Sequence, residues 1–158
     1  MRRKVLAEHK KPTPAHETQA SEGALQFDTG TLTKEQLDGL LNTLPVDITF
    51  IDADDAVRYF NKSGERIFVR PKGVLGRKVH NCHPQKSLHV VNKIVESFKN
   101  GEKNVAEFWI NLHERFVHIR FFAVRDPNGK YLGTMEVVQD LTDIKKLQGE
   151  RRLLDWKQ

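Results

Sequence analysis

The densest group of chemically reactive side chains in the sequence lies in the segment His80-Asn81-Cys82-His83-Pro84. Thiolate and imidazole groups are good ligands for zinc and iron, so His80, Cys82 and His83 are candidate metal or haem ligands. Their spacing matches no standard closed zinc site, and a tetrahedral ion needs a fourth ligand from elsewhere in the chain. The alternative is structural: His83 caps a helix, and Cys82 packs as a small apolar side chain.

Nucleophilic catalysis is the other chemistry that a cysteine beside two histidines suggests. Residues adjacent in sequence seldom supply the geometry of a nucleophile and its base, and no oxyanion-hole glycine motif accompanies Cys82. The loop Gly73-Val74-Leu75-Gly76 does not fit a phosphate-binding pattern either. The sequence therefore favours a binding protein and not an enzyme.

The composition predicts a single cytoplasmic domain. A chain of 158 residues has room for one domain of ordinary size. No apolar run approaches the ~20 residues that span a bilayer, so no membrane segment is expected. Its single cysteine excludes an internal disulfide, which agrees with a reducing compartment.

The net charge of +5 raises the question of nucleic acid binding. The positive charges are dispersed between a basic N-terminal tail and the last segment of the chain, which carries Lys145, Lys146, Arg151 and Arg152. No helix-turn-helix or zinc-finger pattern accompanies them. Specific nucleic acid binding is therefore not expected.

The N-terminal part changes character near residue 30. Residues 1–30 are polar and contain Pro12 and Pro14, which predicts a disordered leader. Thr33-Lys34-Glu35-Gln36 then has the form of a capping box, and a leucine stripe at helical spacing follows. This pattern predicts a helix over residues 33–44, closed by Pro45.

The remaining sequence indicates an α+β domain over residues 31–142. Alternating apolar residues predict five strands, at 46–51, 57–60, 105–112, 115–124 and 131–139. Helical patterns predict a short piece at 61–67, a long helix at 84–100 and a C-terminal helix at 143–158. A hairpin at the start and a meander at the end imply one mostly antiparallel sheet with helices on one face.

An enclosed space between the long helix and the sheet would suit a small molecule. In strand 115–124 one alternate set contains Ile119 and Phe121 and the other contains His118 and Arg120, and the sequence alone leaves open which set faces inward. In strand 105–112, Phe108 and Ile110 share a face that excludes Trp109. The predicted pocket is lined by Val91, Ile94, Val95, Phe108, Ile110, Ile119 and Phe121.

Three segments resemble parts of the PAS domain family. They are NTLPVDITFIDADDAVRYFN, GRKVHNCHPQKSLHVVNKIVESFKNGEK and RFFAVRDPNGKYLGTMEVVQDLTDIKKLQ. The resemblance covers about Leu32 to Leu154. Four shorter segments, LNTLPVDITF, GRKVHNCHP, AEFWI and LLDW, are similar to a PAS domain found at the C-terminus of certain bacterial and archaeal proteins. Those proteins also carry a domain of unknown function and a hemerythrin-like domain, whose iron chemistry is not carried over to this sequence.

The resemblance implies the PAS fold and a sensory or interaction module that binds a small ligand. The signal would pass through the flanking N- and C-terminal helices to a second copy of the chain or to another protein. The alternative that remains open is a haem- or metal-based redox sensor that uses His80, Cys82 and His83.

Some PAS domains bind haem through an axial histidine on the long helix, and here His89 lies on that helix. The helix carries an apolar stripe centred near Val91, and His89 lies roughly 160° away from this centre around the helix axis. An axial ligand must face the enclosed pocket. His89 is therefore expected to point to solvent.

Overall fold

The computed structural model describes residues 23–81 and 85–152, and the chain divides into two compact units, residues 1–37 and 38–158. In the first unit, β1 (Leu25–Phe27) and β2 (Gly30–Leu32) form a small antiparallel hairpin. The hydroxyl of Thr31 donates a hydrogen bond of 2.8 Å across it to the side chain of Gln26. The prediction of a disordered leader is therefore wrong for residues 25–30, where the hairpin forms although the surrounding sequence is polar. Residues 1–22 of that leader lie outside the described residues.

Helix α1 (Lys34–Thr43) confirms the predicted N-terminal helix to within one residue at each end. The capping box is formed as the sequence predicts: the amide of Gln36 donates to the Thr33 hydroxyl, and the amide of Thr33 donates to the Gln36 side chain. No residue of α1 is buried. Leu40 within the helix is 55% exposed, and Leu44, just beyond its end, is 42% exposed. The leucine stripe is thus present: Leu37 and Leu41 are half-buried, and Leu40 and Leu44 are exposed.

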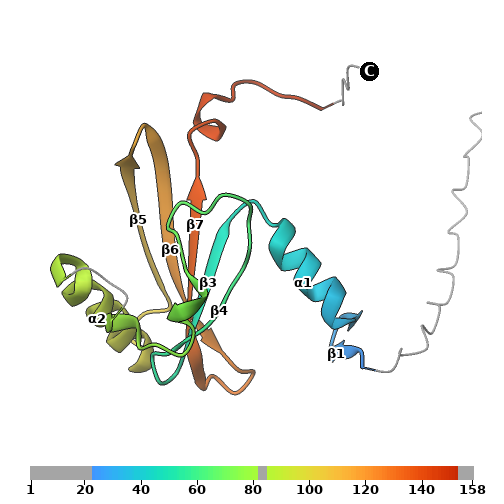
Figure 1. Ribbon diagram of the computed structural model, residues 1–158, viewed down its shortest axis with the longest axis vertical. Helices are drawn as coiled ribbons and strands as arrows, with labels where there is room; N and C mark the ends of the chain where they lie inside the picture. Colours follow the sequence, from blue (N-terminus) through green and yellow to red (C-terminus); the bar gives the residue numbers. More distant parts are fainter. Residues whose placement is uncertain (1–22, 82–84, 153–158) are drawn as a thin grey trace, which may run out of the picture. The chain divides into compact units, whose positions relative to one another are not determined.

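The second unit contains a five-stranded sheet in the order β4-β3-β7-β6-β5, in which every neighbouring pair is antiparallel (Figure 1). Its strands are β3 (Asp47–Asp52), β4 (Val57–Phe60), β5 (Val105–Leu112), β6 (Arg115–Arg125) and β7 (Tyr131–Asp140). The last strand therefore lies at the centre, between β3 of the first hairpin and β6. The predicted sheet and the positions of its strands are confirmed.

Strands β3 and β7 approach each other closely where Gly133 pairs with Asp52. A Cβ atom at Gly133 would lie 2.1 Å from the carbonyl oxygen of Ile51 and 2.7 Å from the ring of Phe50. Only glycine fits this place without a shift of the backbone. The close packing of β7 against β3 therefore requires glycine at position 133.

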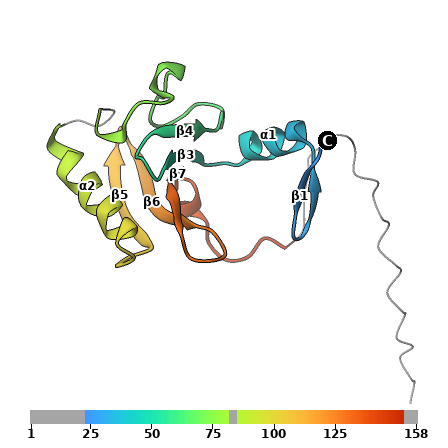
Figure 2. The ribbon, with the colours of Figure 1, turned by 90° about the horizontal axis from the view of Figure 1, so that it is seen from below.

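Helix α2 (Gln85–Lys99) lies along the sheet (Figures 1 and 2). It buries Val91, Val95 and Phe98 against apolar residues of the strands, and the exposed His89 points away from them, as expected. Gly101 ends the helix with a φ of 74°, a left-handed conformation that glycine adopts at little cost. No helix within residues 23–81 and 85–152 is long and apolar enough to cross a membrane.

The predicted C-terminal helix is wrong over residues 143–152. After β7 the chain forms only the 3-10 turn η3 (Ile144–Lys146), and Gly149 has a φ of 66°. Ile144 and Leu147 are 51% and 77% exposed, so these two side chains are not buried against the described part of the chain. A short helix without such burial is marginal in water. Residues 153–158 lie outside the described part of the chain.

Candidate ligand cavity

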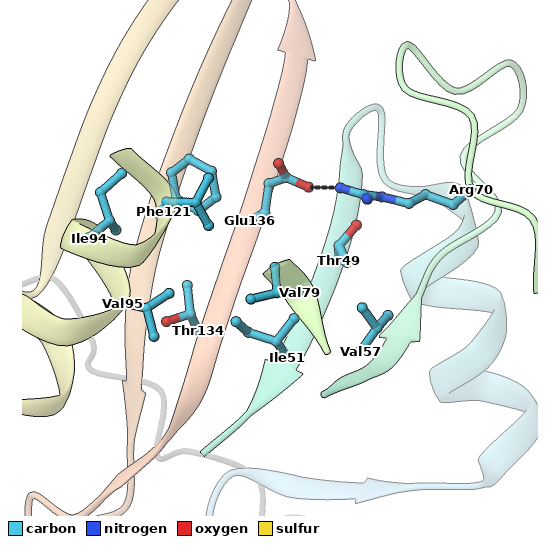
Figure 3. Close-up of a pocket in the computed structure, with 11 residues that line it drawn as sticks. Thr49, Ile51, Val57, Arg70, Val79, Ile94, Val95, Phe121, Thr134 and Glu136 are labelled. Carbon is cyan, nitrogen blue, oxygen red and sulfur yellow. Dashed lines mark hydrogen bonds and ion pairs between the residues drawn. The ribbon is translucent and has the colours of Figure 1, made fainter. Parts of the chain in front are cut away.

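Two adjoining hollows lie between α2 and the inner face of the sheet. The outer cavity has a volume of about 540 Å³, and the inner cavity, about 20 Å³, has room for a single water molecule. The outer cavity is lined by Ile67, Phe68, Val69, Arg70, Ser87, Val90, Val91, Ile94, Phe108, Ile110, Ile119, Phe121 and Glu136. The inner cavity is shown in Figure 3 with its lining residues from α2, β3, β4, β6, β7 and the loops between them.

Every residue of the predicted pocket lines one of these two hollows. Val95 lines the inner cavity, Phe108, Ile110 and Ile119 line the outer cavity, and the others line both. The rings of Phe108 and Phe121 stack with their centroids 5.9 Å apart. That these residues bind a ligand stays a prediction.

The inner face of β6 consists of Val117, Ile119 and Phe121, which are all buried. His118 lies on the opposite face, where its Nε2 is 2.5 Å from Oε1 of Glu107. The sequence left open which alternate set of this strand faces inward, and in the structure it is the apolar set with Ile119 and Phe121. As a result, the walls of the outer cavity are mainly apolar on the sheet side.

An ion pair lies at the boundary of the two cavities. Nη2 of Arg70 donates to Oε2 of Glu136 over 2.8 Å, and the side chains are only 11% and 13% exposed (Figure 3). Nε of Arg70 is buried and has no hydrogen-bond partner among the described residues. An unpaired buried N–H is costly, so this atom is the clearest sign of a place for a missing acceptor.

Arg70 reaches the cavity from an irregular connector, residues 61–70, that joins β4 to the turn η1 (Lys72–Val74). The predicted short helix at 61–67 is wrong, because side chains supply the partners that helical hydrogen bonds would have supplied. The amide of Ile67 donates to the carboxylate of the buried Asp47 over 2.8 Å. Arg66 donates to the carbonyl oxygen of Asn61 over 2.8 Å and to the Thr49 hydroxyl over 3.2 Å.

Burial lowers the pKa of Arg66 from its ordinary value, and the charge of Asp47 acts against this effect. Arginine stays protonated in proteins even so. The guanidinium therefore acts as a permanent cationic clamp between the connector and strand β3. Its Nε also donates to the carbonyl oxygen of Phe68 over 3.4 Å, so the clamp holds the part of the connector that precedes Arg70.

Asn61 is completely buried and uses every hydrogen-bonding position of its side-chain amide. Its Oδ1 accepts from the amide of Ile48 and from Arg66, over 2.7 and 2.9 Å. Its Nδ2 donates to the carbonyl oxygens of Leu41 and Val46, both over 2.9 Å. Asn61 thus joins the connector, strand β3 and the end of α1 at one point.

The predicted metal or haem ligands are only partly described. His80 lies exposed in the 3-10 turn η2 (Val79–Asn81), and Cys82 and His83 lie outside the described residues. Within 23–81 and 85–152, no three His, Cys, Asp or Glu side chains are grouped as a metal site requires. Metal or haem binding at His80, Cys82 and His83 stays a prediction, and an absorbance spectrum with metal analysis of the purified protein tests it.

Sequence reasoning missed Arg70 and Glu136, although one signal was present. In β7, Thr134, Glu136 and Val138 alternate toward the same face as the buried residues of β6. A carboxylate in that series lies on the covered face and needs a buried cationic partner. The partner comes from a loop, and no periodic pattern indicates it.

Comparisons with known proteins agree with this architecture. A family model described as a PAS domain matches residues 37–142. The crystal structure of a C-terminal domain from Streptococcus mutans is 35% identical in sequence, with a TM-score of 0.75, and the match covers 79% of this chain and 97% of that one. No curated protein matches the chain.

Two more distant structures show the same fold. A PAS domain from Colwellia psychrerythraea is 16% identical, with a TM-score of 0.51, over 69% of this chain and 97% of that one. Histidine kinase ThkA, solved in complex with the response regulator protein TrrA, is 24% identical, with a TM-score of 0.52, over 68% of this chain and 32% of that one.

Proposed function

Because the chain belongs to the PAS domain family, we propose that it is a sensory module that holds a small molecule in the outer cavity and reports its presence to a partner protein. The observation that carries this proposal is the outer cavity itself, about 540 Å³ in volume and walled by apolar side chains. Sites for small molecules in proteins have this size and this character. PAS domains are in general sensory modules and not enzymes, and catalysis is not part of the proposal.

The exposed walls support occupation by a ligand. Val90, Phe108 and Ile110 line the outer cavity and are each more than a third exposed. An apolar occupant would remove this surface from water, at roughly 25 cal/mol for each Å². The cavity is thus suited to a ligand with a mainly apolar body.

The proposed route of the signal runs from Arg70 along the connector to Asn61 and from there to α1. Arg70 lines the cavity, and Asn61 donates to the carbonyl oxygen of Leu41 near the end of α1. A ligand that moves Arg70 would change how firmly this end of α1 is held. The exposed Leu40 and Leu44 offer the partner an apolar contact.

The partner is a second copy of this chain or another protein. Sedimentation of a fragment that spans residues 37–158 distinguishes the two, because a strict monomer at high concentration removes the homodimer. From the four short segments given above, we also propose that this PAS domain belongs to the group found behind a hemerythrin-like domain; the similar structure from Streptococcus mutans is itself a C-terminal domain.

A titration with naphthalene, an uncharged apolar probe, tests the proposed site. We expect saturable shifts of the methyl NMR signals of Val91, Ile94 and Ile110. Ile110→Trp fills the outer cavity and should abolish the shifts. Val105→Trp places the same side chain on the opposite face of β5, at an exposed residue, and should leave them unchanged. The absence of any saturable shift in the unaltered protein, with naphthalene and with the two polar naphthalene probes described below, would refute the proposal.

A further inference from the structure

The polar groups at the outer cavity restrict the chemistry of its ligand. Its ionisable lining residues are Arg70 and Glu136, which pair with each other, and most of the remaining wall is apolar. The polar end of a ligand therefore meets this ion pair. The inference that follows rests on the proposed function, since it names the kind of molecule that the same cavity takes.

Arg70 requires an acceptor. Of the five N–H groups of a guanidinium, one on Nη2 is used by Glu136, and the N–H on Nε is buried without a partner among the described residues. Nε has almost no accessible surface, so the guanidinium must turn slightly before a ligand oxygen reaches it; that oxygen would then supply the missing hydrogen bond. A bond to a charged donor is stronger than one between neutral groups.

Glu136 accepts one hydrogen bond from within the described residues, from Arg70. An ionised carboxylate has about four acceptor positions, so capacity for a ligand donor remains. The two side chains are in direct contact, which places the unused acceptor capacity beside the unpaired donor. The ligand should therefore present an acceptor next to a donor.

The charge of the pair argues against an anionic ligand. The formal charges of Arg70 and Glu136 sum to zero, and a carboxylate bound to Arg70 would also meet the negative charge of Glu136. Such a ligand gives up its hydration without a net opposite charge in return, which is unfavourable in an apolar site. A neutral carbonyl group gives up far less hydration and still receives the hydrogen bond.

We propose that the outer cavity selects an uncharged molecule with an apolar, preferably aromatic body and a polar end in which a carbonyl oxygen lies beside an N–H. An amide or a lactam has this arrangement. The carbonyl oxygen accepts from Nε of Arg70, and the N–H donates to the carboxylate of Glu136. The rings of Phe68, Phe108 and Phe121 contact the body of the molecule.

Three probes with a common body test this selection at pH 7.5: naphthalene, 1-naphthaleneacetamide and 1-naphthaleneacetate. Calorimetry and methyl NMR give their dissociation constants. We expect the amide to bind at least tenfold more tightly than the acetate. The opposite order, or equal affinities, would overturn the proposal.

The variant Glu136→Gln supplies the second arm. It removes the negative charge and keeps an oxygen for Arg70, so we expect the acetate to gain at least tenfold in affinity relative to the amide. The matched control Glu107→Gln removes a carboxylate on the outer face of β5 and should leave the ratio unchanged. A ratio that Glu136→Gln does not alter would also overturn the proposal.

The naphthalene arm separates this inference from the proposed function. If naphthalene binds and the amide shows no preference over the acetate, the selection is wrong and the ligand-binding function stands. If none of the three probes binds saturably, both are wrong.

Discussion

The side-chain amide of Asn61 donates a hydrogen bond of 2.9 Å to the carbonyl oxygen of Leu41 and so ties the connector to the end of α1. The same side chain accepts a hydrogen bond from Arg66, which holds the part of the connector that precedes Arg70. A single buried residue therefore lies between the cavity and the helix that is proposed to carry the signal.

Replacement of this residue should be costly. Asn61→Ala leaves the buried amide of Ile48 and the part-buried carbonyl oxygens of Leu41 and Val46 without their partner. We expect the free energy of unfolding to fall by about 3 kcal/mol, since each unsatisfied buried group costs roughly 1 kcal/mol or more. Urea unfolding measures this. Asn92→Ala, on the exposed face of α2, should change stability by less than about 0.5 kcal/mol.

The Arg70–Glu136 pair should show strong coupling between its members. Arg70→Met leaves the Glu136 carboxylate nearly buried and unpaired, and we expect a loss of about 3 kcal/mol in the free energy of unfolding. The double variant with Glu136→Leu removes both charges and should recover most of that loss. Equal free energies of unfolding for the single and double variants would contradict the expected coupling between Arg70 and Glu136. Arg58→Met, at an exposed ion pair with Asp52, should cost less than about 1 kcal/mol.

Asp52 should contribute a pH-dependent part of the stability. Burial acts to raise the pKa of its carboxyl group, but the amide of Ala56, the guanidinium of Arg58 and the amide of Asp54 together outweigh this effect. The pKa in the folded protein therefore lies below the ordinary value of about 3.8. A lowered carboxyl pKa stabilises the fold above the unfolded value, and this contribution is lost as the pH falls through the folded value.

Comparison with Asp52→Asn isolates this contribution. The unaltered protein should be more stable by about 1 kcal/mol from pH 7 down to about pH 5, and the difference should shrink below pH 3.8. Chemical unfolding at a series of pH values measures it. Asp54→Asn changes an exposed carboxylate of the same turn and should change stability by less than about 0.5 kcal/mol. A difference for Asp52→Asn that persists undiminished at the lowest pH would contradict the assignment.

The parts of the fold that follow from local patterns could be predicted. The capping box at Thr33 and Gln36 begins α1, and alternation in 105–139 defines the three strands of the meander. The pocket residues of α2 follow from its apolar stripe, because burial on a helix repeats with a fixed period.

The parts that depend on distant side chains could not be predicted. The connector looks helical in sequence, but the Asp47 carboxylate and the Arg66 guanidinium bond its backbone in a non-helical form. The C-terminal segment has helical spacing, but Ile144 and Leu147 remain exposed and gain little from burial. Arg70 enters the cavity through the connector, so no period of its own element indicates it.

Hydrogen exchange in α1 tests the central claim, that the cavity and this helix are coupled. The measurement compares the amides of Leu41 and Asn42 with and without saturating 1-naphthaleneacetamide, and uses Ile110→Trp as the protein that cannot bind the probe. We expect exchange at these two amides to be at least threefold slower on binding in the unaltered protein and unchanged in Ile110→Trp. Unchanged exchange at these amides, while the methyl signals of the cavity show saturation, would contradict it.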